Sequence, residues 1–136
     1  MIGAPVHDVS SLSELPRLRS LSLYNTKVDS LAPLANLKTL EKLDLGQTAT
    51  SDLTPLVGLE NLRELGLSDT PVLDLRPLAK LDELRSLNLN GTKVSDVLPL
   101  LALTHLESLN LMGAHAPYRD VEKLQHAMPE CFISGY

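Results

Sequence analysis

The sequence predicts an α/β solenoid, a chain wound into short successive turns that each add one strand to a parallel sheet. Three features support this prediction, and all of them recur every 22 residues. The pattern Leu-x-x-Leu-x-Leu begins at Leu18, Leu40, Leu62, Leu84 and Leu106. A threonine follows the pattern at Thr26, Thr48, Thr70 and Thr92. A Pro-Leu pair then begins at Pro33, Pro55, Pro77 and Pro99.

One period accounts for each element of a turn. The last two leucines of the pattern alternate, so both point to one face of a short strand while the residues between them face solvent. Leu31, Leu34 and Leu37 follow at spacings of three, which suits a 3₁₀ or very short helical return, and Pro33 fits its first turn. The threonine hydroxyls are expected to satisfy backbone groups of the adjacent turn. A fixed period of this kind is the signature of leucine-rich repeats, whose apolar faces are shielded only by stacked neighbours.

The repeats predict a single leucine-rich-repeat domain over residues 1–136. Residues 1–17 form a partial first repeat, residues 18–105 hold four full repeats, and residues 106–136 form a variant last repeat.

The last repeat is expected to cap the solenoid. Residues 118–127 lack the proline of the other returns, and Val121 and Leu124 fall on one face, which predicts an α-helix. Continuing the 22-residue register fills the three leucine positions with Met128, Cys131 and Ile133. This register predicts a terminal strand over residues 130–134, with Cys131 facing the core.

At the other end, the register indicates that the chain starts in mid-repeat. Residues 6–15 match residues 28–37, so the strand that would precede Leu18 is missing. We therefore expect an uncapped apolar flank and an unpaired strand edge beside Leu18, Leu21 and Leu23, and bare edges invite pairing. Three interpretations stay open: the chain is cut from a longer protein, it self-associates at this edge, or residues 1–15 cover the edge.

Composition narrows the choice of partner and compartment. The net charge is −5 and no basic stripe with aromatic residues occurs, so nucleic acid is not an expected partner. No run of 18 apolar residues occurs, so no membrane span is expected. The chain starts without a visible signal peptide, which predicts a cytoplasmic location; a secreted effector and a truncated chain remain alternatives.

No catalytic residue, cofactor or metal is expected, so the chain is predicted not to be an enzyme. His115, His126, Asp120 and Cys131 are metal-ligand types, but Cys131 faces the core and His126 lies on a helix, so these side chains should not converge. Serines, histidines and aspartates are scattered singly, and no phosphate-binding loop occurs. A further set of aspartates precedes the proline-containing turns, where capping is favoured over cation binding: Asp52, Asp74 and Asp96.

The residues between the inward leucines are expected to form a sheet face open to a ligand, in three rows of small and polar side chains. The first row is Ser20, Lys42, Glu64, Ser86, Ser108 and Glu130. The second row is Ser22, Asp44, Gly66, Asn88, Asn110 and Phe132. The third row is Tyr24, Gly46, Ser68, Asn90, Met112 and Ser134.

Eight residues of these rows are candidate contacts for a protein partner: Tyr24, Asp44, Glu64, Asn88, Asn90, Asn110, Met112 and Phe132. The register places Met112 and Phe132 beside the three asparagines, in a mixed patch near the C-terminal end. Aromatic anchors ringed by polar groups concentrate binding energy. The alternative for Phe132 is that it only covers the last strand.

The run from Val72 to Leu81 resembles the 22-residue repeats of bacterial internalins, and also the phosphatase-regulatory class of repeats with the same period. The resemblance covers roughly residues 6–133. It implies a curved, right-handed solenoid with a parallel β-sheet on a ligand-binding concave face and helical returns on the convex face. The chain departs from the family in two ways. Threonine stands where such families usually carry an asparagine ladder, and the helical N-terminal cap and the export segments of internalins are missing.

Together these features predict a protein–protein interaction module that binds a partner protein through the concave sheet face and the adjacent loops. The alternative is an assembly module that self-associates, or that docks onto a missing part of a longer chain, through its uncapped N-terminal edge.

Overall fold

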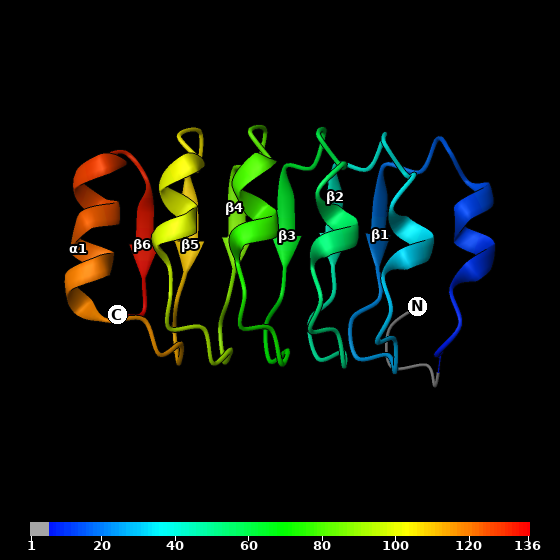
Figure 1. Ribbon diagram of the computed structural model, residues 1–136, viewed down its shortest axis with the longest axis horizontal. Coiled ribbons are helices and arrows are strands. Elements are labelled where there is room, and N and C mark those ends of the chain that lie inside the picture. Colours follow the sequence, from blue (N-terminus) through cyan, green and yellow to red (C-terminus); the bar gives the residue numbers. More distant parts are fainter. Residues whose placement is uncertain (1–5) are drawn as a thin grey trace.

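The structure is a computed structural model that describes residues 6–136. These residues form an open six-stranded parallel sheet, five 3₁₀ turns and one α-helix, arranged in a row from one end of the molecule to the other (Figure 1). The strands follow the chain order: β1 (Ser20–Ser22), β2 (Lys42–Asp44), β3 (Glu64–Gly66), β4 (Ser86–Asn88), β5 (Ser108–Asn110) and β6 (Phe132–Ser134). The helical elements are η1 (Ser10–Glu14), η2 (Ala32–Leu34), η3 (Thr54–Leu56), η4 (Arg76–Lys80), η5 (Leu98–Ala102) and α1 (Tyr118–Ala127).

This architecture confirms the predicted α/β leucine-rich-repeat solenoid with its parallel sheet, its short helical returns and its C-terminal helix. Residues 1–5 of the predicted partial first repeat lie outside the described residues.

Each strand pairs with the equivalent residues of the next repeat. Leu21 lies opposite Leu43, and Leu43 lies opposite Leu65. The same separation of 22 residues holds from β1 through β5. Residues that lie opposite each other in neighbouring strands point to the same side of a sheet, so the inward leucine of one strand lies beside the inward leucine of the next. The sheet therefore has one continuous apolar face and one continuous solvent face.

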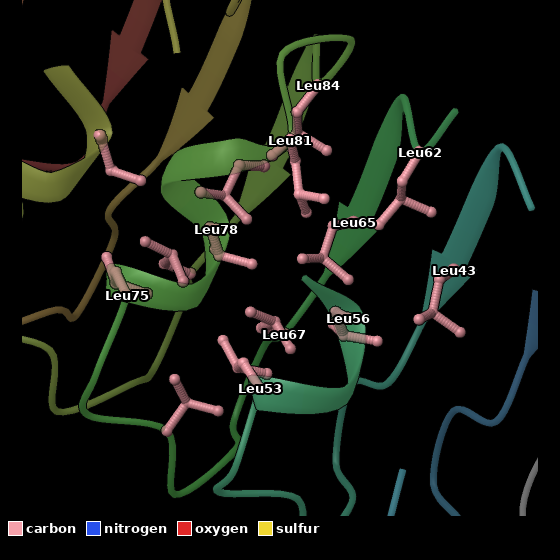
Figure 2. Close-up of a cluster of buried hydrophobic side chains, with 14 of the residues drawn as sticks. Leu43, Leu53, Leu56, Leu62, Leu65, Leu67, Leu75, Leu78, Leu81 and Leu84 are labelled. Atoms are coloured by element: carbon pink, nitrogen blue, oxygen red, sulfur yellow. The ribbon is translucent and has the colours of Figure 1, made fainter. Parts of the chain in front are cut away.

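Columns of leucine form the core between the sheet and the helical returns. Figure 2 shows Leu65 and Leu67, from β3 and the residue that follows it, pointing toward leucines of the returns such as Leu56 and Leu78. All four side chains are buried, with at most 2% of their surface exposed. Each fully buried leucine contributes about 1.5–3 kcal/mol through the removal of apolar surface from water. The repeated leucines are therefore the main source of stability.

Aspartates cap the 3₁₀ turns, as the sequence predicts. The carboxylates of Asp52, Asp74 and Asp96 each accept a hydrogen bond from the backbone N–H two residues later, at 2.8, 2.9 and 3.1 Å. Hydrogen bonds from the side chain and backbone of Thr54 lower the pKa of Asp52. Those from Arg76 lower the pKa of Asp74 to about 2. Asp52 and Asp74 therefore accept these hydrogen bonds as ionised carboxylates.

Four buried threonines close the turns that follow strands β1 to β4. Their Oγ1 atoms donate to the carbonyl oxygen three residues earlier, at 2.7 or 2.8 Å, in Thr26, Thr48, Thr70 and Thr92. Each of these bonds lies within a single repeat. Thr50 is also buried, but its Oγ1 has no hydrogen-bond partner in the described part of the chain. The equivalent positions of other repeats hold valine: Val28, Val72 and Val94.

The last repeat corrects the predicted register. Ser108 lies opposite Phe132, and Leu109 lies opposite Ile133, so the final period is 24 residues and not 22. The helix and the turn at residues 129–130 together take two more residues than a 3₁₀ return does. The terminal strand consequently begins at Phe132, and the prediction of a strand over residues 130–134 is two residues too long. Its Glu130 lies in the turn, outside the sheet.

The burial expected in the last repeat is nevertheless correct, since Met128, Cys131 and Ile133 are all buried. Val121 and Leu124 of α1 are fully buried as well, so the helix packs on the core. Burial raises the pKa of the Cys131 thiol.

The N-terminal edge is less well buried than the middle of the solenoid. Within residues 6–136, β1 is an edge strand that pairs only with β2. Leu18 and Leu21 are half-buried, whereas their equivalents Leu40 and Leu43 are at most 2% exposed. Leu15 is 47% exposed beside them. The expected apolar flank is therefore present at Leu18 and Leu21, but Leu23, which was expected to belong to it, is fully buried.

Candidate protein-binding surface

The side of the sheet that faces away from the core is here named the open sheet face. It is formed by the strand residues that alternate with the inward leucines, and the helical elements lie on the opposite side of the core (Figure 1). From β1 through β5 the three predicted rows lie as expected, because the register is constant there. In β6 the rows shift by two residues, so Phe132 joins the row of Ser108 and Ser134 joins the row of Asn110.

A hollow of about 390 Å³ lies on the open sheet face over β1 to β4, away from its C-terminal end. Its shape depends on two glycines. A Cβ atom at Gly46 would lie 2.8 Å from Cδ2 of Tyr24 and 2.6 Å from Oγ of Ser68. A Cβ atom at Gly66 would lie 2.7 Å from Oδ1 of Asp44. The ring of Tyr24 thus lies over Gly46 and the carboxylate of Asp44 lies over Gly66, each in the next repeat. The side chain of a larger residue at either glycine would take up that space.

Three charged side chains stand on the described strands of this face. Nζ of Lys42 and Oε1 of Glu64 form an ion pair at 2.6 Å. Asp44 is different: its Oδ1 accepts a hydrogen bond from the backbone N–H of Gly46 at 3.0 Å. No cation of residues 6–136 forms an ion pair with its carboxylate. The hollow therefore contains a carboxylate without a counter-charge.

Asn88 of β4 and Asn110 of β5 each use their side-chain oxygen in a hydrogen bond to the backbone. Oδ1 of Asn88 accepts the backbone N–H of Asn90 at 3.0 Å, and Oδ1 of Asn110 accepts the backbone N–H of Met112 at 2.9 Å. These bonds hold the side chains at the ends of β4 and β5. Both asparagines remain partly exposed, so their amide nitrogens are available as donors to a ligand.

Phe132 and Met112 are well exposed, at 70% and 58%, but they do not form the single patch that the sequence predicts. Phe132 lies opposite Ser108, and Ser108 precedes Met112 by four residues along the chain. At about 3.3 Å per residue, that spacing separates the two side chains by about 13 Å. They are two separate apolar points on the open sheet face.

An exposed aromatic pair near the C-terminus was not among the predicted contacts. The ring centroids of Tyr118 and Tyr136 lie 6.1 Å apart, and both side chains are exposed. Tyr118 begins α1, and Tyr136 follows β6. No signal in the sequence predicted this pair, because the register of β6 that positions Tyr136 is known only from the structure.

The candidate metal ligands do not come together. In the described residues, no group of three or more histidine, cysteine, aspartate and glutamate side chains is placed to hold a metal ion. Nδ1 of His126 lies 2.7 Å from the carbonyl oxygen of Glu122. Asp120 pairs with Nζ of Lys123 at 2.8 Å, and this contact lowers the pKa of Asp120.

Residues 6–136 contain no helix with the length and apolar character needed to cross a membrane.

Comparisons with known proteins agree with this geometry. A family model described as Leucine Rich repeats (2 copies) matches residues 16–59. Internalin C2 of Listeria monocytogenes is 28% identical over all of this chain, with a TM-score of 0.86. A second internalin of that organism is 24% identical over 97% of the chain, with a TM-score of 0.84. A leucine-rich-repeat protein of Leptospira interrogans is 24% identical over 95% of it, with a TM-score of 0.85.

The chain spans only part of these proteins: 59% of the internalin C2 chain, 45% of the second internalin and 34% of the Leptospira protein. No curated protein sequence is significantly similar to it.

The repeats, the sheet and these neighbours define a leucine-rich-repeat solenoid. Within that class, the chain is similar in structure to internalins of Listeria monocytogenes and to a Leptospira leucine-rich-repeat protein, which confirms the resemblance drawn from the sequence. Leucine-rich-repeat folds commonly mediate protein–protein interaction and are typically binding modules without catalytic activity.

Proposed function

We propose that this chain binds a partner protein through the open sheet face and the loops that follow the strands. The observation that carries the proposal is the face itself, a parallel sheet whose outer side is left uncovered by every other described element (Figure 1). A sheet of this kind offers rows of hydrogen-bonding groups on a rigid support. Its mostly small side chains allow a partner to approach the backbone closely.

The size of the face indicates that the loops take part. Six strands about 4.8 Å apart, with about four facing residues each, present roughly 300–400 Å². A standard interface needs about 800 Å² on each partner. The residues that follow the strands are the nearest additional surface, and each has a positive φ angle: Asn25, Gln47, Asp69, Gly91 and Gly113.

The eight candidate contacts divide into three groups in this proposal. Tyr24, Asp44 and Glu64 surround the hollow. A second group supplies amide donors and acceptors between strands: Asn88, Asn90 and Asn110. Met112 and Phe132 supply apolar anchors at two separate points, and such exposed side chains gain most from being covered by a partner.

The test compares charge insertions on the two sides of the molecule. Ser86→Arg introduces a long cation at the centre of the open sheet face, where Ser86 lies opposite Ser108 in the sheet. Glu60→Arg changes an exposed residue on the return side and serves as the matched control. Affinity capture from native lysate should recover a partner with the wild type and with Glu60→Arg but not with Ser86→Arg. A partner retained equally by both variants would move the interface away from the open sheet face.

A second function, self-association, is favoured by the N-terminal edge. Leu18 and Leu21 are half-buried, Leu15 is exposed, and β1 has one unpaired side among the described strands. Unpaired strand edges with apolar flanks are templates for pairing. Light scattering across a range of protein concentrations tests this function. A mass that rises with concentration in the wild type but not in Leu15→Glu supports assembly, and a constant monomer mass in both excludes it.

A cytoplasmic location and the absence of a cofactor stay predictions within this proposal.

A further inference from the structure

The N-terminal hollow differs in charge from the rest of the open sheet face. Lys42 and Glu64 neutralise each other, whereas the carboxylate of Asp44 accepts a hydrogen bond from a backbone N–H group and forms no ion pair with a cation of residues 6–136. The remaining strand residues of this face are uncharged, and the chain as a whole carries a net charge of −5. A ligand seated in the hollow therefore meets one uncompensated negative charge, and a positive group is its complement.

An aromatic ring stands next to that carboxylate. Ser22 lies opposite Asp44, so Tyr24 lies one inter-strand step and two residues away. Diagonal neighbours of this kind have Cα atoms about 7–8 Å apart, close enough for one long side chain placed between them to contact both. Both side chains are partly exposed, and each lies over a glycine of the next repeat, Tyr24 over Gly46 and Asp44 over Gly66.

We propose that the hollow receives an arginine side chain presented by the partner protein. The guanidinium group pairs with the carboxylate of Asp44 and stacks on the ring of Tyr24. This inference rests on the proposed binding function and specifies the chemistry of the partner. Arginine fits better than lysine because its planar cation can both form two parallel hydrogen bonds to a carboxylate and lie against an aromatic ring.

The geometry of Asp44 explains why both interactions can be made at once. Its Oδ1 is held by the N–H of Gly46 and lies over Gly66, which fixes the orientation of the carboxylate before a ligand arrives. A side chain held in advance loses little conformational entropy on binding. Gly46 similarly provides the surface on which the Tyr24 ring lies. The two glycines are thus positioning residues for the two side chains that contact the ligand.

The experiment selects displayed random linear peptides against the wild-type chain. The strongest binder is then synthesised with arginine and with citrulline, which has nearly the same shape and no charge. Affinities are measured by calorimetry for the wild type, Asp44→Asn and Glu107→Gln. Asp44→Asn keeps an acceptor for the Gly46 N–H group, and Glu107→Gln removes an exposed charge that pairs with Arg85 outside the hollow.

We expect the citrulline peptide to bind the wild type about fivefold more weakly than the arginine peptide, as for a partly exposed ion pair. Replacing arginine by citrulline in the peptide should not change its affinity for the Asp44→Asn variant. It should weaken binding to the Glu107→Gln variant as much as it weakens binding to the wild type. Tyr24→Phe should retain binding and Tyr24→Leu should weaken it, because only the first keeps a ring. Circular dichroism of each variant establishes that its fold is intact.

Selected peptides that lose binding to Ser86→Arg, but that need no arginine or show no dependence on Asp44, would overturn this inference and leave the proposed function standing. Peptides that prefer lysine over arginine at the hollow would also overturn it. Peptides that bind Ser86→Arg as well as the wild type would place ligand binding elsewhere, and would overturn both proposals.

Discussion

Leu109 of β5 lies opposite Ile133 of β6, 24 residues further along the chain, whereas Leu21 lies opposite Leu43 at a separation of 22. The two extra residues accommodate α1 in place of a 3₁₀ return. The change of period has a functional effect, because it moves Phe132 along the sheet to the row of Ser108. The two exposed apolar side chains of the C-terminal half are thereby separated.

Thr50 offers a direct test of core energetics. Its buried Oγ1 has no hydrogen-bond partner in the structure of residues 6–136, and leaving such a group unsatisfied costs about 1–3 kcal/mol. Thr50→Val should therefore raise the free energy of unfolding by about 1–2 kcal/mol, measured by urea denaturation. Thr48→Val is the control and should lower it by about 1 kcal/mol, because Oγ1 of Thr48 donates to Leu45 at 2.7 Å. Equal effects of the two changes would contradict this account.

Gln47 adopts a φ of 56°, in the left-handed region that side chains with a Cβ adopt at a cost of about 1–2 kcal/mol. Gln47→Gly should raise the free energy of unfolding by up to about 1 kcal/mol, since part of the gain is offset by the greater freedom of glycine in the unfolded chain. Chemical denaturation measures the difference. Gly113→Ala is the matched reverse change, because its φ is 71° and an added Cβ meets nothing closer than 3.5 Å. Gly113→Ala should lower the free energy of unfolding. An increase would contradict the view that a residue with a Cβ is strained at this positive φ.

The capping aspartates predict a loss of stability in acid. The folded-state pKa of Asp74 is lowered to about 2 from an ordinary value of 3.8, and the pKa of Asp52 is lowered as well. A carboxylate with a lowered pKa stabilises the fold fully above its unfolded pKa, and this contribution disappears as the pH falls through the folded value. The midpoint of urea unfolding should fall between about pH 4 and pH 2. Asp74→Asn should reduce this dependence; an identical acid response of wild type and Asp74→Asn would refute the prediction.

Burial along the solenoid predicts that equal truncations differ in cost. Leu65→Ala in the middle of the sheet should lower the free energy of unfolding by about 2–5 kcal/mol, as large-to-small changes in cores do. Leu21→Ala at the half-buried edge should cost roughly half as much, because less apolar surface is removed from the core. Guanidinium unfolding of the two variants compares them. Similar costs at both positions would mean that the edge is covered in solution.

The repeats themselves could be predicted from the sequence because their spacing is constant. Leu43, Leu65 and Leu87 occupy one position of the pattern, and the structure places them in one column of the sheet. The last strand could not be placed in this way. A shift of two residues leaves every side chain on the same face of a strand, so the burial of Cys131 and Ile133 fits both registers.

The candidate surface was predicted only in part for a related reason. The outward position of Tyr24 and Asp44 follows from alternation along the strand. Their arrangement around the hollow depends on side chains that lean over Gly46 and Gly66, which requires knowledge of what lies opposite in the next strand. The loss of the Met112–Phe132 patch follows from the register of β6 alone.

The half-buried N-terminal edge also affects how the molecule opens. Each strand contacts only its immediate neighbours in the sheet, so the chain is close to a one-dimensional stack in which repeats detach in order from a weak end. Amide hydrogens of β1 should exchange fastest and those of β3 and β4 slowest. A ligand that bridges Tyr24 after β1 and Asp44 of β2 would fasten the fraying repeat to the next one. Ligand binding would then stabilise the N-terminal repeat against local unfolding.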